Sequence, residues 1–186
     1  MTRFVIVSFL PDNINKILEP VRDHFEPGVN AQIPPHISLT YPFFWKAEKN
    51  ELVREMEKET RNFSPFLAII SGIGVFFNPS HSGGVKGKQV IYAQVLPEEP
   101  FREIHKSFEK ALTGNVKFDT SQFPQKTLPS FIPHITLVMN GVEKDLKTAQ
   151  KMISSVIGYS FMVENVWLLK KEEGSEKWEK VKEITF

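Results

Sequence analysis

The spacing of apolar residues along the chain predicts a series of strands and helices. Short runs rich in Val, Ile and Phe are typical of strands, and such runs cover residues 3–10, 33–44, 65–77, 89–96, 131–139, 159–170 and 177–186. Apolar residues at helical spacing predict helices over residues 11–25, 98–112 and 142–157, and the charged stretch 46–61 predicts an exposed helix. Gly72 and Gly74 predict a bend or bulge in the third strand.

The predicted elements recur in one order in the two halves of the chain. Residues 1–77 and residues 88–186 each give strand, helix, strand, helix, strand, and the second half adds a last strand that forms a C-terminal hairpin. We therefore predict one domain over residues 1–186 with pseudo-symmetric halves. Its fold class is α+β, with two lobes that are each a small, mainly antiparallel sheet with helices on the outer face. The active-site cleft is expected between the lobes.

One short motif occurs in both halves. Residues 35–40 (PHISLT) return as residues 133–138 (PHITLV), with a hydroxyl residue two places after each histidine. Successive side chains of a strand point to opposite faces, so each histidine shares a face with its hydroxyl residue while Ile and Leu share the other face. Two such strands side by side would place four polar residues together, namely His36, Ser38, His134 and Thr136.

Composition and charge exclude several kinds of site. The chain has 41% apolar and 24% charged residues, which is ordinary for a globular protein. A net charge of +1 argues against coating of nucleic acid by bulk electrostatics, although a local basic patch would still hold a nucleotide or an RNA end. The chain has no cysteine and therefore no disulfide, thiolate metal site or cysteine nucleophile. It has neither a signal-peptide pattern nor an apolar run long enough for a membrane, so we expect a cytoplasmic protein.

Two histidines beside two hydroxyls suit the hydrolysis of a phosphodiester. Because the pKa of histidine lies near neutrality, one imidazole can accept a proton while a second donates one. Such a pair would activate the attacking water or hydroxyl on one side of a phosphorus atom and protonate the departing oxygen on the other. The hydroxyls of Ser38 and Thr136 would donate hydrogen bonds to the non-bridging phosphate oxygens.

This pair of H-x-[ST]-L motifs, about a hundred residues apart in a duplicated α+β chain, resembles the 2H phosphoesterase superfamily. That superfamily includes the 2′-5′ RNA ligase-like proteins and RNA 2′,3′-cyclic phosphodiesterases, and the resemblance covers nearly the whole chain in element order. It implies phosphodiester chemistry on an RNA end or a small nucleotide, without a metal or other cofactor. It also implies that His36 and His134 are the catalytic residues and that Ser38 and Thr136 hold the phosphate. Nothing in the sequence indicates an obligate protein partner.

The sequence departs from the family pattern at one position. RNA ligase-like members often carry an arginine two residues after the leucine of the second motif, where this chain has Met139. By strand alternation we expect Met139 to point into the core, so a basic phosphate clamp would come from another part of the chain. The candidates in the polar stretches 78–88 and 114–130 are Lys86, Lys88 and Lys126.

Aromatic residues close to the first motif offer a surface for a base. Tyr41 and Phe44 follow His36 within a few positions and are candidates for base stacking, although aromatic residues at this density are more often part of a core. The remaining histidines on predicted helices, His24 and His105, are expected at the surface.

Other interpretations remain open from the sequence. A single histidine in a strand is usually structural, but packing alone gives no reason to repeat an imidazole and a hydroxyl at matching positions. Zinc requires three or four strong ligands, and each motif supplies one. Joining of RNA ends would use the same groups as hydrolysis, and a non-catalytic protein that binds RNA or nucleotides would have the same fold. The near symmetry of the motifs leaves the acid and the base unassigned.

Overall fold

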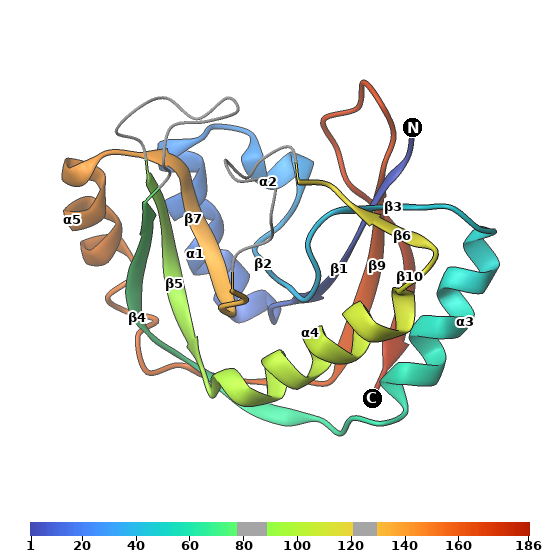
Figure 1. The fold of residues 1–186 in the computed structure, drawn as a ribbon. Helices are drawn as coiled ribbons and strands as arrows, with labels where there is room; N and C mark the ends of the chain where they lie inside the picture. Colours follow the sequence, from blue (N-terminus) through green and yellow to red (C-terminus); the bar gives the residue numbers. More distant parts are fainter. Residues whose placement is uncertain (78–88, 121–129) are drawn as a thin grey trace.

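Ten strands form one sheet in the computed structural model, which describes residues 1–77, 89–120 and 130–186 (Figure 1). The strands are β1 (Arg3–Phe9), β2 (His36–Ser38), β3 (Phe43–Trp45), β4 (Phe66–Phe77), β5 (Gln89–Leu96), β6 (Val116–Phe118), β7 (His134–Gly141), β8 (Ser160–Val163), β9 (Asn165–Lys171) and β10 (Glu179–Thr185). The helices are α1 (Asp12–Phe25), α2 (Val29–Gln32), α3 (Lys49–Thr60), α4 (Glu98–Leu112) and α5 (Glu143–Met152). None of the helices in these described ranges is long and apolar enough to cross a membrane.

The sheet divides into two lobes at the pair β2–β7. The strand order is β10-β9-β1-β2-β7-β5-β4-β8, and all neighbours along it are antiparallel. We call β10-β9-β1-β2, together with β3 and β6, the first lobe, and β7-β5-β4-β8 the second lobe. In this strand order, four strands lie on each side of the contact between β2 and β7. The two sets of four strands are therefore arranged with pseudo-two-fold symmetry. The predicted α+β fold with two antiparallel lobes is confirmed.

Each lobe takes strands from both halves of the sequence. β4 belongs to residues 1–77 but lies in the second lobe, whereas β9 and β10 come from the C-terminal end and lie in the first lobe. The helices cross over as well, because α1 packs against β7 while α3 and α4 pack on each other and α3 contacts β10 (Figure 1). A division of the chain between residues 77 and 88 therefore does not separate the two lobes.

Several predicted elements have different limits in the structure. The strand predicted over residues 159–170 is two strands, β8 and β9, which lie in different lobes. The strand predicted over residues 33–44 divides into β2 and β3, and the stretch predicted as a loop over residues 114–130 contains β6, which pairs with β3. Aromatic packing explains this last pair, because the ring of the fully buried Phe43 meets the rings of Phe4 at 6.0 Å and Phe118 at 6.3 Å.

Apolar residues fill both faces of the central strands of the first lobe. Ile37 of β2 and Ile135 of β7 are fully buried in the main core, as alternation predicts. A smaller apolar cluster consists of Val5, Val7 and Leu169 and is separate from the main core. Alternate residues of β1 contribute to the two clusters, because successive side chains of a strand point to opposite faces.

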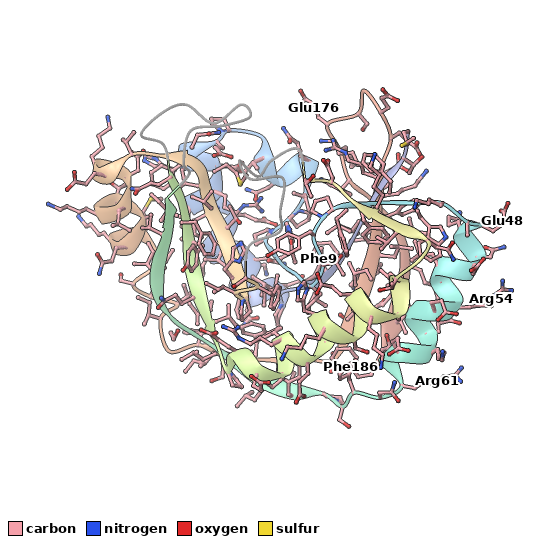
Figure 2. All side chains as sticks on the ribbon, in the orientation of Figure 1. Phe9, Glu48, Arg54, Arg61, Glu176 and Phe186 are labelled. Carbon is pink, nitrogen blue, oxygen red and sulfur yellow. The ribbon has the colours of Figure 1, made fainter. Side chains whose placement is uncertain are left out.

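Helix α3 covers the first lobe with one apolar side. Leu52 and Met56 are fully buried, while Arg54 is exposed and points away from the sheet (Figure 2). The prediction of an exposed helix is therefore correct for one of its sides only, as is usual for an amphipathic helix.

His105 of α4 is buried, so its predicted surface position is wrong. His105 is only 6% exposed, and its Nδ1 donates a hydrogen bond of 2.8 Å to the carbonyl of Leu39. Its ring stacks on Phe131 with centroids 4.1 Å apart. This hydrogen bond connects α4 to the first motif. His24 of α1 is exposed, as predicted.

The glycines of β4 have unequal space around them. The register of β4 against β5 shifts between Ile70 and Gly72, which agrees with the predicted bulge. Gly74 pairs with Tyr92, and a Cβ atom at Gly74 would lie 2.4 Å from Cζ of the tyrosine ring. At Gly72 the nearest atom to such a Cβ is Oε1 of Gln94, at 3.1 Å. Glycine at 74 therefore lets the aromatic ring lie across the strand, whereas Gln94 is a flexible chain that can move.

We predict that Gly74→Ala destabilises the protein more than Gly72→Ala does. The first substitution forces the Tyr92 ring out of place, at a cost of about 1–3 kcal/mol in the free energy of unfolding. The second should change it by less than about 1 kcal/mol, and in either direction, because alanine also restricts the unfolded chain. Urea denaturation of both variants and the parent gives these values. Equal stabilities of the two variants would contradict the packing described for Tyr92.

Candidate active site

The two motifs lie side by side at the junction of the lobes. Ile37 of β2 pairs with Ile135 of β7 in an antiparallel register. This register sets each histidine opposite the hydroxyl residue of the other motif, at the Cβ separation of about 4.5–5.5 Å usual for cross-strand neighbours. The two histidines are then diagonal neighbours, about 7–8 Å apart by the same geometry. The four residues brought together in this way are His36, Ser38, His134 and Thr136.

These four side chains share the face of the sheet that is turned away from the main core. All four are half-buried, whereas the intervening Ile37 and Ile135 are fully buried. Within the described residues, no side-chain hydrogen bond occupies the hydroxyl of Ser38 or Thr136. Both hydroxyls are therefore able to donate to an anion placed between the histidines.

Both imidazole rings are held by backbone carbonyls in the same way. Nδ1 of His36 lies 2.8 Å from the carbonyl oxygen of Pro34, and Nδ1 of His134 lies 2.7 Å from that of Ile132. A carbonyl oxygen only accepts hydrogen bonds, so Nδ1 is the protonated nitrogen in each ring. In the neutral form of each ring, Nε2 is then the nitrogen with a free lone pair. Each ring therefore offers the same atom for proton transfer.

Burial keeps both imidazoles in the neutral form. It lowers the pKa of His36 from the ordinary 6.5 to about 4, against the opposing effect of the hydrogen bond to Pro34. The positive charge of Arg22 lowers this pKa further, as would, to a smaller extent, a positive charge on His134. Burial also lowers the pKa of His134, again opposed by the hydrogen bond to Ile132. The charge of Arg22 contributes to the lowered pKa of His36 but not to that of His134, so the two rings differ in their electrostatic surroundings.

Arg22 is a buried arginine that the sequence analysis did not select. It is 4% exposed on α1, and its Nη1 donates a hydrogen bond of 2.9 Å to the carbonyl of Ile33, in the segment that leads into β2. Burial lowers the pKa of its guanidinium, although three neighbouring carboxylates oppose the effect. A signal for it was present, because Arg22 follows the apolar Leu18 by four positions and so lies on the buried side of the helix.

Aromatic rings surround the two histidines. Phe9 of β1 pairs with His36 in the strand register, with ring centroids 6.4 Å apart. On the other side, Phe76 and Tyr92 meet the ring of His134 at centroid distances of 4.9 and 5.2 Å, and they stack on each other at 4.2 Å. The sequence analysis missed these three residues, because their contacts depend on strand pairings that the sequence does not reveal.

The aromatic residues chosen from the sequence contact other residues. The ring of Tyr41 packs edge-on against His105, with centroids 5.7 Å apart, and burial raises the pKa of its hydroxyl to about 12, helped by the charge of Glu109. Phe44 lies on β3, paired with Lys117 of β6. Neither residue has a ring contact with His36 or His134 in the described part of the chain.

Met139 is exposed, so its predicted position in the core is wrong. Met139 is 43% exposed, whereas the two residues before it, Leu137 and Val138, are both buried. The register of β7 against β5 shifts twice in this part of the sheet, and such bulges break the alternation of faces. The backbone N–H groups of Met139 and Asn140 donate to the carboxylate of Glu26, at 2.6 and 3.3 Å.

The sequence analysis also considered lysines as phosphate contacts and a bound metal ion. The three lysines proposed from the sequence as phosphate contacts, Lys86, Lys88 and Lys126, lie outside the described residues. Among residues 1–77, 89–120 and 130–186, no three histidine or acidic side chains gather closely enough to hold a metal ion.

Comparison with known proteins places this geometry in a family. Residues 10–175 match the model of the 2′-5′ RNA ligase superfamily. The chain is 27% identical over 139 residues to the “Putative phosphoesterase GK0864” of Geobacillus kaustophilus, a match that covers 73% of this chain and 68% of that protein.

Solved structures share the fold over the whole chain. TT0787 of Thermus thermophilus superposes with a TM-score of 0.63 at 18% identity, covering 98% of this chain and 97% of its own. LigT of E. coli, complexed with NADP+ and with 3′-AMP, gives TM-scores of 0.59 and 0.52 at 13% identity, covering 100% of this chain and 97% and 98% of LigT. The family match covers most of the sequence, and the two-lobed fold agrees with it. This chain belongs to the 2′-5′ RNA ligase superfamily, the group of 2H phosphoesterases that its paired motifs predicted.

Proposed function

We propose that this protein is a metal-independent phosphodiesterase that hydrolyses 2′,3′-cyclic or 2′,5′-linked phosphodiesters of RNA ends or nucleotides. The observation that carries the proposal is the pairing of β2 with β7, which sets two imidazoles and two hydroxyls on one face. Membership of a phosphoesterase superfamily supports the reaction class. The nucleotides found with E. coli LigT support a substrate that contains a nucleoside and a phosphate.

The reaction needs one proton acceptor and one proton donor on opposite sides of phosphorus. Nε2 of the first histidine removes a proton from water, whose oxygen forms a bond to phosphorus. The bond from phosphorus to the departing ribose oxygen breaks, and Nε2 of the second histidine, in its protonated form, gives that oxygen a proton. The product of a 2′,3′-cyclic substrate is a phosphomonoester with one free hydroxyl. General acid and general base catalysis each contribute about 10²–10⁴-fold.

The hydroxyls of Ser38 and Thr136 hold the non-bridging oxygens of the phosphate. Each lies opposite a histidine in the register of the strands, so a phosphate between the rings reaches both. Negative charge on these oxygens increases in the transition state, and donors that are already in place stabilise it without reorganisation.

The charge of Arg22 supports different roles for the two histidines. A nearby cation disfavours protonation of His36, which suits the proton acceptor. Arg22 does not contribute to the lowered pKa of His134. The negative phosphate of a bound substrate favours the protonated form of His134. We therefore assign His36 as the general base and His134 as the general acid in hydrolysis. Arg22 acts through His36 and is a positioning residue rather than a catalytic one.

Hydrolysis in the presence of EDTA tests the proposed reaction. The substrates are a 2′,3′-cyclic nucleotide, an RNA with a 2′,3′-cyclic phosphate end and a 2′,5′-linked dinucleotide. We predict turnover of at least one of them by the parent, a loss of about 10²–10⁴-fold in kcat for His36→Ala and His134→Ala, and a loss of about 10²-fold for Ser38→Ala and Thr136→Val. The measurement is product formation by liquid chromatography.

His24→Ala is the matched control, because His24 is an exposed histidine on α1 and should leave turnover unchanged. Unchanged turnover in His36→Ala or His134→Ala would contradict the two-histidine mechanism. Binding of these ligands by a parent that converts none of them would instead indicate a non-catalytic nucleotide-binding protein.

The pH dependence of kcat/KM tests the assignment of the base. As the pH falls, activity is lost when His36 becomes protonated. The acid limb of the pH profile of kcat/KM should therefore lie well below the ordinary histidine pKa of 6.5, towards 4. Arg22→Met removes a positive charge, which makes protonation of His36 easier and should move this limb to higher pH. Arg22→Lys keeps the charge and is the control, with a limb close to that of the parent. An acid limb at the same pH in the methionine variant would contradict the proposed action of Arg22.

A further inference from the structure

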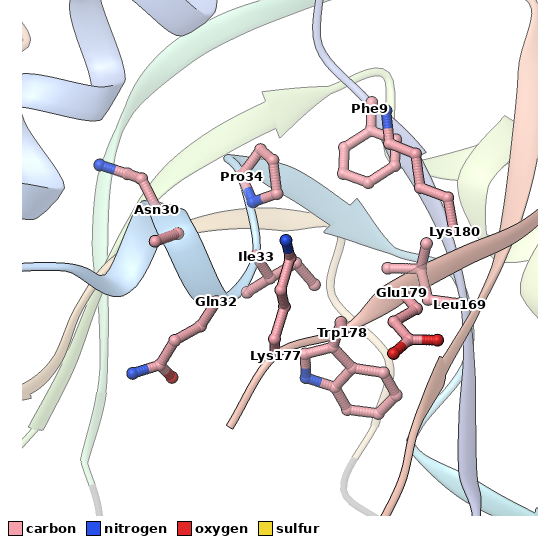
Figure 3. Close-up of a pocket in the computed structure, with 11 residues that line it drawn as sticks. Phe9, Asn30, Gln32, Ile33, Pro34, Leu169, Lys177, Trp178, Glu179 and Lys180 are labelled. Atoms are coloured by element: carbon pink, nitrogen blue, oxygen red, sulfur yellow. The ribbon is translucent and has the colours of Figure 1, made fainter. Parts of the chain in front are cut away.

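A pocket opens beside the candidate active site on the first lobe. Its volume is about 530 Å³, within the range of small-molecule sites. It lies between the end of β1, the segment from α2 to β2, and the C-terminal hairpin (Figure 3). The residues that matter for the argument are Phe9, Pro34, Leu169, Lys177, Trp178 and Lys180.

Two neighbours of His36 line the pocket. Phe9 lines it and is the cross-strand partner of His36, one strand spacing or about 4.8 Å away. Pro34 lines it too, and the carbonyl of Pro34 accepts the hydrogen bond from Nδ1 of His36. A ligand whose phosphate lies at His36 would therefore reach this pocket past the ring of Phe9.

The floor and far wall of the pocket are apolar and aromatic. Leu169 belongs to the small cluster with Val5 and Val7, on the same face of the sheet as His36 and Ser38 by the register of β1 with β2 and β9. Trp178 is half-buried, and its backbone N–H donates a hydrogen bond of 2.9 Å to the carbonyl of Gln32. The indole is thus attached to a fixed backbone while one side of it faces the pocket.

Lysines stand at the rim of this aromatic surface. Lys180 is exposed, and its Nζ lies 4.6 Å from the ring centroids of both Phe9 and Trp167. Lys177 is exposed as well, and Figure 3 shows its ammonium group over the pocket. Aromatic rings beside exposed ammonium groups are a combination with which proteins hold single-stranded nucleic acid, because the rings stack on bases and the lysines neutralise phosphates.

We propose that this pocket binds the nucleoside of the substrate, with its base stacked on Trp178 and with Lys177 and Lys180 beside the phosphodiester chain. The inference rests on the proposed function, because it takes the phosphate at the histidines as the point to which the nucleoside is attached. Stacking tolerates any base, so the site selects for a nucleoside over a simple phosphodiester and does not select a sequence. In this interpretation Phe9 separates the base from the reacting phosphate.

Binding of two ligands by calorimetry tests the subsite apart from turnover. The ligands are uridine 3′-monophosphate and the base-free 1-O-methylribose 3-phosphate. We expect the parent to bind the nucleotide more tightly than the base-free ligand. Trp178→Ala should weaken nucleotide binding about ten- to hundredfold and leave the base-free ligand unaffected, while Trp178→Phe should retain most of the affinity. In turnover assays Trp178→Ala should raise KM and leave kcat unchanged.

Lys180 and Lys182 both lie on β10, so a variant of Lys182 is the matched control for the loss of charge at Lys180. Lys180 is opposite Leu169 and faces the pocket, whereas Lys182 is opposite Leu168 after a register shift and contacts Glu57 at 3.6 Å. Lys180→Met should weaken binding of a short RNA and reduce its salt dependence, and Lys182→Met should do neither.

Equal affinity of the parent for the two phosphate ligands, or an equal loss of both in Trp178→Ala, would overturn the subsite. Thermal unfolding of each variant shows whether a loss of binding reflects a loss of folding. Because these experiments measure binding, a parent that binds the nucleotide without hydrolysing any substrate would count against the proposed reaction and not against the pocket.

Discussion

The pairing of β2 with β7 is the interaction on which the candidate site depends. It is a short junction, centred on Ile37 and Ile135, and it is the place where the strand path passes from the first lobe to the second. Burial of both isoleucines fixes the face of each strand, because a slip of one residue would turn every side chain over. The polar face then carries both histidines and both hydroxyls. Hydrophobic burial on one side of the junction therefore determines the chemistry on the other side.

The electrostatics of the site follow from the same burial. Packing of the rings against Phe9, Phe76 and Tyr92 removes water and lowers the pKa of both histidines, while a backbone carbonyl fixes the proton of each ring on Nδ1. Both rings are then neutral with a lone pair on Nε2, so in the proposed reaction an anion would have to enter before one of them could donate a proton. The charge of the phosphate would supply the missing stabilisation for one imidazolium. In the proposed reaction, the acid would therefore form only when the substrate is bound.

Much of the fold and of the candidate site followed from local patterns. The two motifs needed only strand alternation to place an imidazole and a hydroxyl on one face, and the limits of α1 and α4 followed from apolar spacing. What failed depends on contacts that are distant in sequence. The exchange of β4, β9 and β10 between the lobes has no local signal, and the same is true of the bulges that expose Met139.

Residues whose roles depend on tertiary packing were the hardest to predict. His105 follows Phe101 by four positions and so lies on the apolar side of α4, a signal that the sequence analysis did not use. Arg22 was detectable in principle, since a charge on the apolar side of a helix requires a buried partner. Trp178 and Lys180 belong to the predicted C-terminal hairpin, and only the pairing of β9 with β1 brings this hairpin close to the first motif.

The central claim is that two neutral histidines, each with its proton on Nδ1, face one phosphate site. Long-range proton–nitrogen NMR of the imidazole rings tests it most directly, with the signals assigned from His36→Gln and His134→Gln. At pH 7 the account predicts neutral rings with Nδ1 protonated in both, and a shift of His134 towards the imidazolium form when uridine 3′-monophosphate is added. Protonation on Nε2 in either ring, or two imidazolium rings in the free protein, would contradict it.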